Sequence, residues 1–389
     1  MQNTKIDDDH SGNNDYIKKE DICNKLSIFE NNQKMSCRLS KSLGVAPMLD
    51  VTTQHFLQLC RIISPNFLLY TEMIHCNAII HHANDLSQLL GPPFPDTVIQ
   101  LGGSDPEAMS QAAVILARNG WRDININIGC PSSKVQHNNF GAILMKSPDL
   151  VARIVTAMAE VNQHDDISPI TISVKCRVGV DDIDSYEQLY HFISTVSKTN
   201  FVNHFIIHAR KCWLKGLSPA QNRTIPKLDY ERVYRLANDF PNLLFTINGG
   251  IDNIDKVVEQ LEKVDGVMIG RKDFYGIPPK PDLEIINEYI DYLSAHLASL
   301  TASKLSTLSL SILLKPIFMI FSGSKGKCFR RHLQLNIIKY RKSNSFESNF
   351  DNDNINNYTL KLVDDIRSFV KQSISDAELE HENKKNQSQ

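Results

Sequence analysis

Eight short apolar segments alternate, for the most part, with helical patterns between residues 43 and 271. They span residues 43–49, 67–73, 96–103, 123–128, 170–179, 204–210, 243–250 and 266–271. Near-continuous apolar strands joined by crossover helices are typical of parallel sheets buried on both faces. Eight repeats close a (β/α)8 TIM barrel, which we predict. A doubly wound open sheet is the alternative, but it rarely needs eight regular units, and no GxGxxG opens the first strand–helix turn.

The chain of 389 residues is longer than a barrel of about 250 residues requires. Residues 1–39 are polar, with Asn and Asp clusters, and we expect a disordered extension there. The predicted barrel occupies residues 40–280. Helical periodicities then predict a small all-helical domain over residues 281–375, with an insertion near 295–310. Residues 376–389 are predicted to form a polar tail.

The predicted helical domain is locally basic although the formal net charge of the chain is only -2. No Asp or Glu occurs between Ser303 and Ser345, whereas Lys and Arg recur throughout that stretch. Solvated helix faces normally mix both signs of charge, so a solvated face is the weaker interpretation. We therefore expect a basic surface that binds a polyanion.

The chain carries no sequence signal for secretion or for a membrane. Its 8 cysteines are scattered without a CxxC pair, which favours free thiols in a reducing compartment. No apolar run reaches the length of a membrane span, and the acidic N-terminus lacks an apolar core. Histidines lack the HExxH spacing of a zinc site, so we expect no metal. A cytoplasmic enzyme is the expectation.

Cys130 follows the strand that contains Ile124, Ile126 and Ile128, and lies between Gly129 and a proline. In parallel α/β folds, active sites form at the carboxyl ends of the strands. Polar residues follow for about ten positions, which places the thiol on a shaped loop. A small buried cysteine is the alternative interpretation.

Polar and glycine residues occur at the carboxyl ends of the other predicted strands as well. They include Glu72, Gln100, Asn127, Lys175, Arg177, His208, Arg210, Asn248, Gly249, Gly250, Gly270 and Arg271. Turns after the seventh and eighth strands are the usual phosphate site of such barrels. A phosphate there, with Lys175 and Gln100 deeper inside, suits FMN. A salt bridge in the barrel mouth is the alternative role for Lys175, and a satisfied core histidine is the alternative for His208.

Several of these segments carry recognisable motifs. They are VAPMLDVT, LLYTEM, QLGGSDP, NIGCPSSKVQ with FGAILM, VKCRVGVDD, IIHARKCWLKGLSPAQNR, INGG and GVMIGR. In these motifs the chain resembles the tRNA-dihydrouridine synthases, above all their bacterial A-type branch, from about residue 43 to residue 271. The match continues weakly through GSKGKCFRRHL.

The resemblance implies an FMN enzyme that uses NADPH to reduce the 5,6 double bond of uridine in the tRNA D-loop, at positions 20 and 20a for the A-type branch. It implies Cys130 as the general acid. The implied FMN-binding residues are Pro47, Met48, Leu49, Gln100, Lys175, His208, Asn248, Gly249, Gly250, Gly270 and Arg271. The implied tRNA-binding residues are Asn127, Asn222, Arg223, Lys327 and Arg330. No stable protein partner is implied.

Two departures from the family pattern concern the site. Val51 stands where many relatives have Trp, and Ile143 replaces a cysteine often found after Gly-Ala. Two other functions stay open at this stage. One is an FMN barrel that reduces a free pyrimidine, and the other is a tRNA-binding protein whose catalysis is dispensable. The free-pyrimidine reductase does not explain the basic segment, and the tRNA-binding protein predicts that Cys130→Ala leaves cellular function intact.

Overall fold

A closed barrel of eight parallel strands forms the centre of the computed structural model. The structure describes residues 43–164, 166–270, 280–306, 308–321, 323–343 and 355–387. The strands are β1 (Leu43–Val45), β2 (Leu68–His75), β3 (Thr97–Gly102), β4 (Asp123–Asn127), β5 (Thr171–Arg177), β6 (Val202–His208), β7 (Leu244–Asn248) and β8 (Gly266–Ile269). Each strand pairs in parallel with the next, and β8 closes on β1. The predicted (β/α)8 barrel is confirmed.

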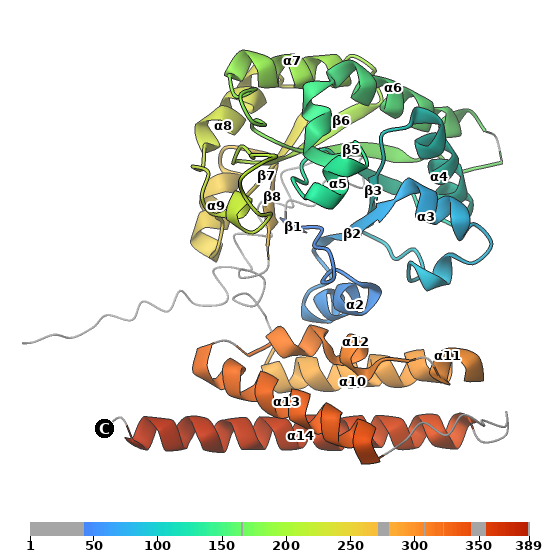
Figure 1. Cartoon of the computed structure of the whole chain (residues 1–389), viewed down its shortest axis with the longest axis vertical. Coiled ribbons are helices and arrows are strands. Elements are labelled where there is room, and N and C mark those ends of the chain that lie inside the picture. Colours follow the sequence, from blue (N-terminus) through green and yellow to red (C-terminus); the bar gives the residue numbers. More distant parts are fainter. Residues whose placement is uncertain are drawn as a thin grey trace, which may run out of the picture. The chain divides into compact units, whose positions relative to one another are not determined.

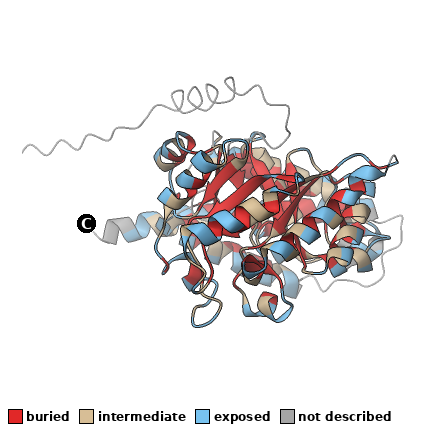
Figure 2. Cartoon of the chain, turned by 90° about the horizontal axis from the view of Figure 1, so that it is seen from above, coloured by how far each residue is buried: buried red, intermediate tan, exposed pale blue. Residues whose placement is uncertain are grey.

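Helices separate the strands and cover the outside of the barrel (Figure 1). They are α2 (Gln54–Ile63), α3 (Cys76–His81), α4 (Pro106–Arg118), α5 (Ser133–His137), α6 (Pro148–Ala159), α7 (Tyr186–Ser197), α8 (Tyr230–Asp239) and α9 (Ile254–Leu261). Short 3-10 turns are η1 (Leu86–Gln88), η2 (Gly141–Lys146), η3 (Glu160–Gln163) and η4 (Gln221–Arg223). Figure 2 shows buried strands surrounded by helices whose outer faces are exposed.

The helix starts follow from local chemistry. Asp105 accepts a hydrogen bond from the backbone N–H of Glu107, and Pro106 occupies the first position of α4. Ser185 and Gln188 form a reciprocal capping box at the start of α7. Such caps satisfy N–H groups that have no partner within the helix, so they fix where each helix begins.

The chain after the barrel forms a helical C-terminal segment (Figure 1). It contains α10 (Asp282–Ala298), α11 (Ala302–Ser306), α12 (Leu310–Leu314), the 3-10 turn η6 (Pro316–Met319), α13 (Gly323–Ser343) and α14 (Ile355–Gln387). The helix α10 packs on α2 of the barrel, where the His55 Nδ1 and Tyr292 hydroxyl groups are 2.8 Å apart. Pro316 begins η6 directly after α12, so the helical chain is divided there into two short pieces.

The prediction of a polar tail over residues 376–389 is wrong for the part that the structure describes. Helix α14 continues to Gln387 and packs along α13. Ala377 is fully buried, and Glu380 accepts a hydrogen bond from His332 at 3.0 Å. The polar composition of this stretch hid a helix that is held to its neighbour by charged side chains. The predicted extension over residues 1–39 lies outside the described residues, and the boundary at residue 280 stays a prediction.

Candidate active site

Strand register brings the predicted site residues to one end of the barrel. Asn127 pairs with Lys175 across β4 and β5, and Arg177 pairs with His208 across β5 and β6. His208 in turn pairs with Asn248 across β6 and β7. Since parallel strands all end at the same rim, these side chains share the barrel mouth, where active sites of this fold form.

An amide network lies across β3, β4 and β5. Asn127 Nδ2 donates to Gln100 Oε1 at 2.8 Å, and Gln100 Nε2 donates to Asn125 Oδ1 at 2.7 Å. Asn125 Nδ2 then donates to Ser173 Oγ at 2.9 Å. Gln100 and Asn125 are almost completely buried, so each amide orientation is fixed by its neighbours. Gln100 therefore forms a rigid polar floor near the mouth.

Lys175 is a cation in the mouth that is held by an amide. Its Nζ donates to Asn248 Oδ1 at 3.1 Å, while Asn248 Nδ2 donates to Met268 O at 2.8 Å. Within the described ranges Lys175 takes part in no ion pair, so the salt bridge considered above is not found there. Burial, and then the charge of Arg177, lowers the pKa of Lys175 to about 8. Such a cation fits an anionic or oxygen-rich ligand.

The turn after β7 forms a cradle that requires glycine. Gly249 and Gly250 have φ angles of 108° and 73°. A Cβ added at Gly249 would lie 2.5 Å from His208 Cδ2, and one at Gly250 would lie 2.5 Å from Leu228 Cδ1. The Tyr230 hydroxyl donates to Gly249 O at 2.6 Å and fixes the turn. Burial holds the pKa of His208 well below its ordinary value, so the imidazole is neutral.

These features fit a flavin phosphate and ring. The cradle is a turn of bare backbone beside a buried histidine, and phosphate sites are commonly built from such turns. Just after β6, Arg210 has a buried Nε atom for which the described residues supply no hydrogen-bond partner, and this suits an acceptor on a ligand. Gly270 is half-buried at the end of β8, and Arg271 lies outside the described residues.

Cys130 lies just beyond β4 and is half-buried. Its backbone N–H donates to Asn127 Oδ1 at 3.0 Å, and the N–H of Gly129 donates to the same oxygen at 3.1 Å. Burial raises the pKa of the Cys130 thiol, and the Ser132 backbone and the charge of Arg177 offset only part of this effect. The thiol is therefore protonated near neutral pH, as a proton donor must be.

The first predicted cofactor residues lie in the loop after β1. Pro47 and Met48 are half-buried, whereas the Leu49 side chain is 60% exposed. Thr52 Oγ1 accepts from the Met48 N–H at 2.9 Å and closes the loop. The loop is thus ordered by its own contacts, with Leu49 facing solvent.

The predicted tRNA-binding residues have different environments. Asn222 is fully buried, and its amide bonds Trp213 N, Trp213 O and Leu217 O within its own loop. Arg223 and Lys327 are exposed. Arg330 Nη1 donates to the carbonyl groups of Phe318 and Phe321 at 3.3 Å each. Of these side chains, Asn222 orders a loop rather than presenting itself to solvent.

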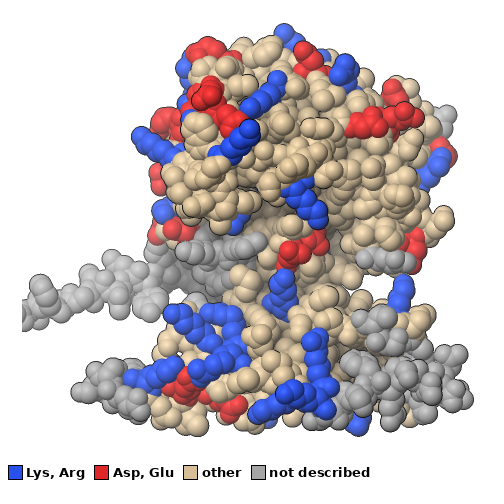
Figure 3. Space-filling model, in the orientation of Figure 1, with Lys and Arg blue, Asp and Glu red and all other residues tan. Residues whose placement is uncertain are grey.

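Basic side chains gather over the helical C-terminal segment on the face seen in Figure 3, with some acidic side chains among them. Lys325 pairs with Glu378 at 2.8 Å, and Arg331 pairs with Glu380. Helix α14 thus neutralises part of the basic run that the sequence shows. Lys315, Lys327 and Lys342 stay exposed.

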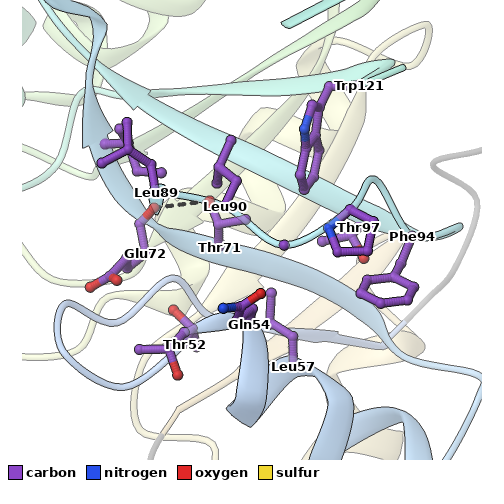
Figure 4. Close-up of a pocket in the computed structure, with 14 residues that line it drawn as sticks. Thr52, Gln54, Leu57, Thr71, Glu72, Leu89, Leu90, Phe94, Thr97 and Trp121 are labelled. Atoms are coloured by element: carbon purple, nitrogen blue, oxygen red, sulfur yellow. Dashed lines mark hydrogen bonds between the residues drawn. The ribbon is translucent and has the colours of Figure 1, made fainter. Parts of the chain in front are cut away.

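A small cavity lies beside the loop after β1 and strand β2 (Figure 4). Thr52, Gln54, Thr71, Leu90 and Trp121 are among the residues that line it. It offers about 20 Å³ to a water-sized molecule, which is room for one water and far too little for a flavin. Glu72 is the one predicted strand-end residue among its lining residues, and none of the predicted cofactor- or tRNA-binding residues lines it.

Two negative findings apply to the described residues only. In those ranges no helix is long and apolar enough to cross a membrane. The same part of the chain contains no group of three or more His, Cys, Asp or Glu side chains that could hold a metal ion.

Fold and site together define a (β/α)8-barrel enzyme whose mouth combines a glycine cradle, a buried cation and a protonated thiol. A model of the dihydrouridine synthase family matches residues 44–351. The chain belongs to the dihydrouridine synthase family.

Curated proteins named tRNA-dihydrouridine(20/20a) synthase are similar to this chain in sequence. The protein from Escherichia coli (strain K12) is 47% identical over 255 residues, which cover 65% of this chain and 72% of that protein. The protein from Vibrio cholerae serotype O1 is 39% identical over 320 residues, or 78% of this chain and 92% of that protein. The Shewanella oneidensis protein is 44% identical over 247 residues, or 64% and 71% respectively.

Sequence reasoning missed two side chains that hold the thiol loop. Arg177 Nε donates to Gly129 O at 2.9 Å, and Gln136 Nε2 donates to Pro131 O at 2.8 Å. The sequence indicates Arg177 only as a strand-end residue and Gln136 only as part of a family motif. A weak signal existed, because an arginine in an apolar strand needs partners.

Proposed function

We propose that this chain is a tRNA-dihydrouridine synthase that binds FMN, takes electrons from NADPH and reduces the 5,6 double bond of D-loop uridine. Membership of the dihydrouridine synthase family supports the reaction class. Relatives named for positions 20 and 20a support those positions. Because the substrate is tRNA, we place the reaction in the cytoplasm.

The observation that carries the proposal is the protonated Cys130 thiol at the same barrel end as the Lys175–Asn248 pair and the glycine cradle. When bound, FMN would supply hydride chemistry for uridine C6. The chain itself must supply the proton for C5. Cys130 Sγ–H is the donor in our proposal, and its raised pKa keeps that proton available until the substrate carbon becomes basic.

The remaining predicted residues hold the reactants. Gly249 and Gly250 would accept the FMN phosphate, with His208 as a neutral wall beside them. Lys175 would place its positive charge near the ring oxygens, with Asn248 fixing its direction. Asn127 would shape the thiol loop, since its carbonyl oxygen accepts from both Gly129 and Cys130.

Exposed cations on the helical C-terminal segment would bind the tRNA backbone. A uridine in a folded D-loop must leave its stack to reach a barrel mouth, so the enzyme needs contacts with the surrounding phosphates. Lys327 on α13 and Arg223 after β6 are exposed and suit this task. Asn222 contributes indirectly by holding the loop that carries Arg223.

The test is mass spectrometry of an unmodified tRNA transcript after incubation with the FMN-loaded protein and NADPH. We expect a gain of about two mass units in a D-loop fragment, from the added hydride and proton. A parallel reaction contains free uracil and orotate in place of tRNA. Reduction of a free pyrimidine without reduction of tRNA would replace this proposal by the free-pyrimidine reductase.

A further inference from the structure

Three successive backbone carbonyl groups around the thiol are each held by a hydrogen bond. Gly129 O accepts from Arg177 Nε at 2.9 Å, and Cys130 O accepts from the Ala142 N–H at 2.9 Å. Pro131 O accepts from Gln136 Nε2 at 2.8 Å. Gly141 lets the chain approach this closely, because a Cβ there would lie 2.6 Å from Cys130 O. The backbone on both sides of the thiol is therefore clamped.

The two side chains of this clamp also hold the loop between β6 and α8, residues 209–229. Arg177 Nη1 donates to Asn222 O at 3.1 Å and approaches Lys211 O at 3.3 Å. Gln136 Nε2 donates a second hydrogen bond to Leu214 O at 2.8 Å. Each donor thus joins the thiol loop to the β6–α8 loop through main-chain carbonyl groups.

Arg177 is a charged residue whose hydrogen bonds go to neutral backbone carbonyl groups. Its side chain is buried, and within the described ranges it takes part in no ion pair. A buried guanidinium that is not paired with a carboxylate costs free energy, so hydrogen-bond acceptors must stabilise its positive charge. The fork of N–H donors meets this need by contacting carbonyl groups from two loops at once.

Gln136 also donates to carbonyl groups of both loops, and because it is neutral its burial costs less free energy. A primary amide carries two N–H donors on one nitrogen, and here each has a carbonyl acceptor from a different loop. Because the side chain is neutral and half-buried, it can be replaced with little risk to folding. It is the better position at which to test the clamp.

We infer that Arg177 and Gln136 are positioning residues that couple the β6–α8 loop to the placement of the Cys130 thiol. The inference rests on the proposed function, because it is tRNA that would engage the β6–α8 loop. When RNA fixes this loop, through Arg223 among other residues, both donors are fixed with it. The carbonyl groups that flank Cys130 are then fixed as well, and the thiol takes the position from which it can donate a proton.

The main variant is Gln136→Met, which keeps the length of the side chain and removes both donors. Gln188→Met is the matched control, because Gln188 is an exposed glutamine whose side chain caps α7 by accepting from the Ser185 N–H and contacts neither loop of the clamp. Single-turnover reduction of tRNA is measured in the FMN-loaded protein, with each variant in both the wild-type and the Cys130→Ala background. Binding of tRNA is measured separately.

We expect Gln136→Met to lower the single-turnover rate on the order of tenfold, as loss of positioning hydrogen bonds does. Its tRNA affinity should change little, and Gln188→Met should behave as the unmodified protein. In the Cys130→Ala background, Gln136→Met should cause no further loss, since it acts only through the thiol. An equal loss in both backgrounds, or no loss in either, would overturn the coupling.

A second measurement does not depend on turnover. The alkylation rate of Cys130 by iodoacetamide is followed on its own peptide by mass spectrometry in tRNA-free protein. Loosening of the clamp in Gln136→Met should raise this rate severalfold, and Gln188→Met should leave it unchanged. Equal rates in all three proteins would contradict the clamp. If wild-type protein fails to reduce tRNA, the proposed function fails, while the alkylation result still decides whether the clamp exists.

Discussion

Gly249→Ala tests whether the turn after β7 is a cofactor cradle. Gly249 has a φ of 108°, a region in which an L-residue costs about 1–2 kcal/mol. The new Cβ would also lie 2.5 Å from His208 Cδ2 and 2.7 Å from Nε2. His208 is only 9% exposed, so it has little room to move, and overpacking of this kind costs about 1–3 kcal/mol. The expected loss of stability is about 2–5 kcal/mol.

Gly216→Ala is the control for this experiment. Gly216 has a φ of 85°, but nothing lies within 4 Å of its added Cβ. It should therefore lose only the conformational part, about 1–2 kcal/mol. Urea unfolding of the cofactor-free proteins gives the stabilities, and quenching of flavin fluorescence gives the FMN affinity. We expect weakened FMN binding in Gly249→Ala alone. Equal stability and equal FMN affinity in the two variants would refute the cradle.

Three further predictions concern charge and loop order. The Lys175 ammonium has a pKa of about 8 and loses its proton as the pH rises through that value, so the affinity for FMN should fall between pH 7 and 9. In a fluorescence titration, Lys175→Met should bind FMN more weakly at pH 7, and its affinity should not change with pH. Asn222→Ala should cost about 2–3 kcal/mol in urea unfolding, because it strands the buried backbone groups that its amide satisfies, and an unchanged midpoint would argue against this role. Lys327→Gln should reduce the slope of log K for tRNA binding against log[salt] by about 0.9. The control Lys325→Gln loses a cation already paired with Glu378, so it should change this slope less. Equal slopes in the two variants would mean that Lys327 does not contact the RNA.

The barrel could be predicted because its strands are buried on both faces. Segments such as residues 204–210 and 243–250 have apolar centres, and the structure places β6 over most of the first, starting two residues earlier, and β7 within the second. Predicted ends differ from observed ends by only a few residues, since terminal residues depend on caps and turns. Helix α14 was missed beyond residue 375, because its stability comes from contacts with α13 that no local pattern reveals.

The candidate site was predictable where a residue type had a chemical reason to lie at a strand end. Lys175 is such a residue, because a lysine in an apolar strand needs a partner or a ligand. The roles of Gln136 and Asn222 could not be predicted, because each depends on backbone carbonyl groups elsewhere in the chain. For Gln136 one such group is 78 residues away, and for Asn222 they are 5 and 9 residues away. The Leu214 partner of Gln136 lies in a different loop, and the partners of Asn222 lie in its own irregular loop, where no periodic pattern indicates the pairing.

The central claim is that Cys130 supplies the proton for tRNA uridine reduction. The most direct test compares wild type with Cys130→Ala in single-turnover reduction of tRNA, followed by mass spectrometry of the D-loop fragment. Loss of a general acid costs about 10²–10⁴ in rate, so we expect the two-mass-unit gain to be slowed by that factor while FMN and tRNA affinities persist. If Cys130→Ala reduces tRNA at the wild-type rate, Cys130 is not the acid and the proposed mechanism is wrong.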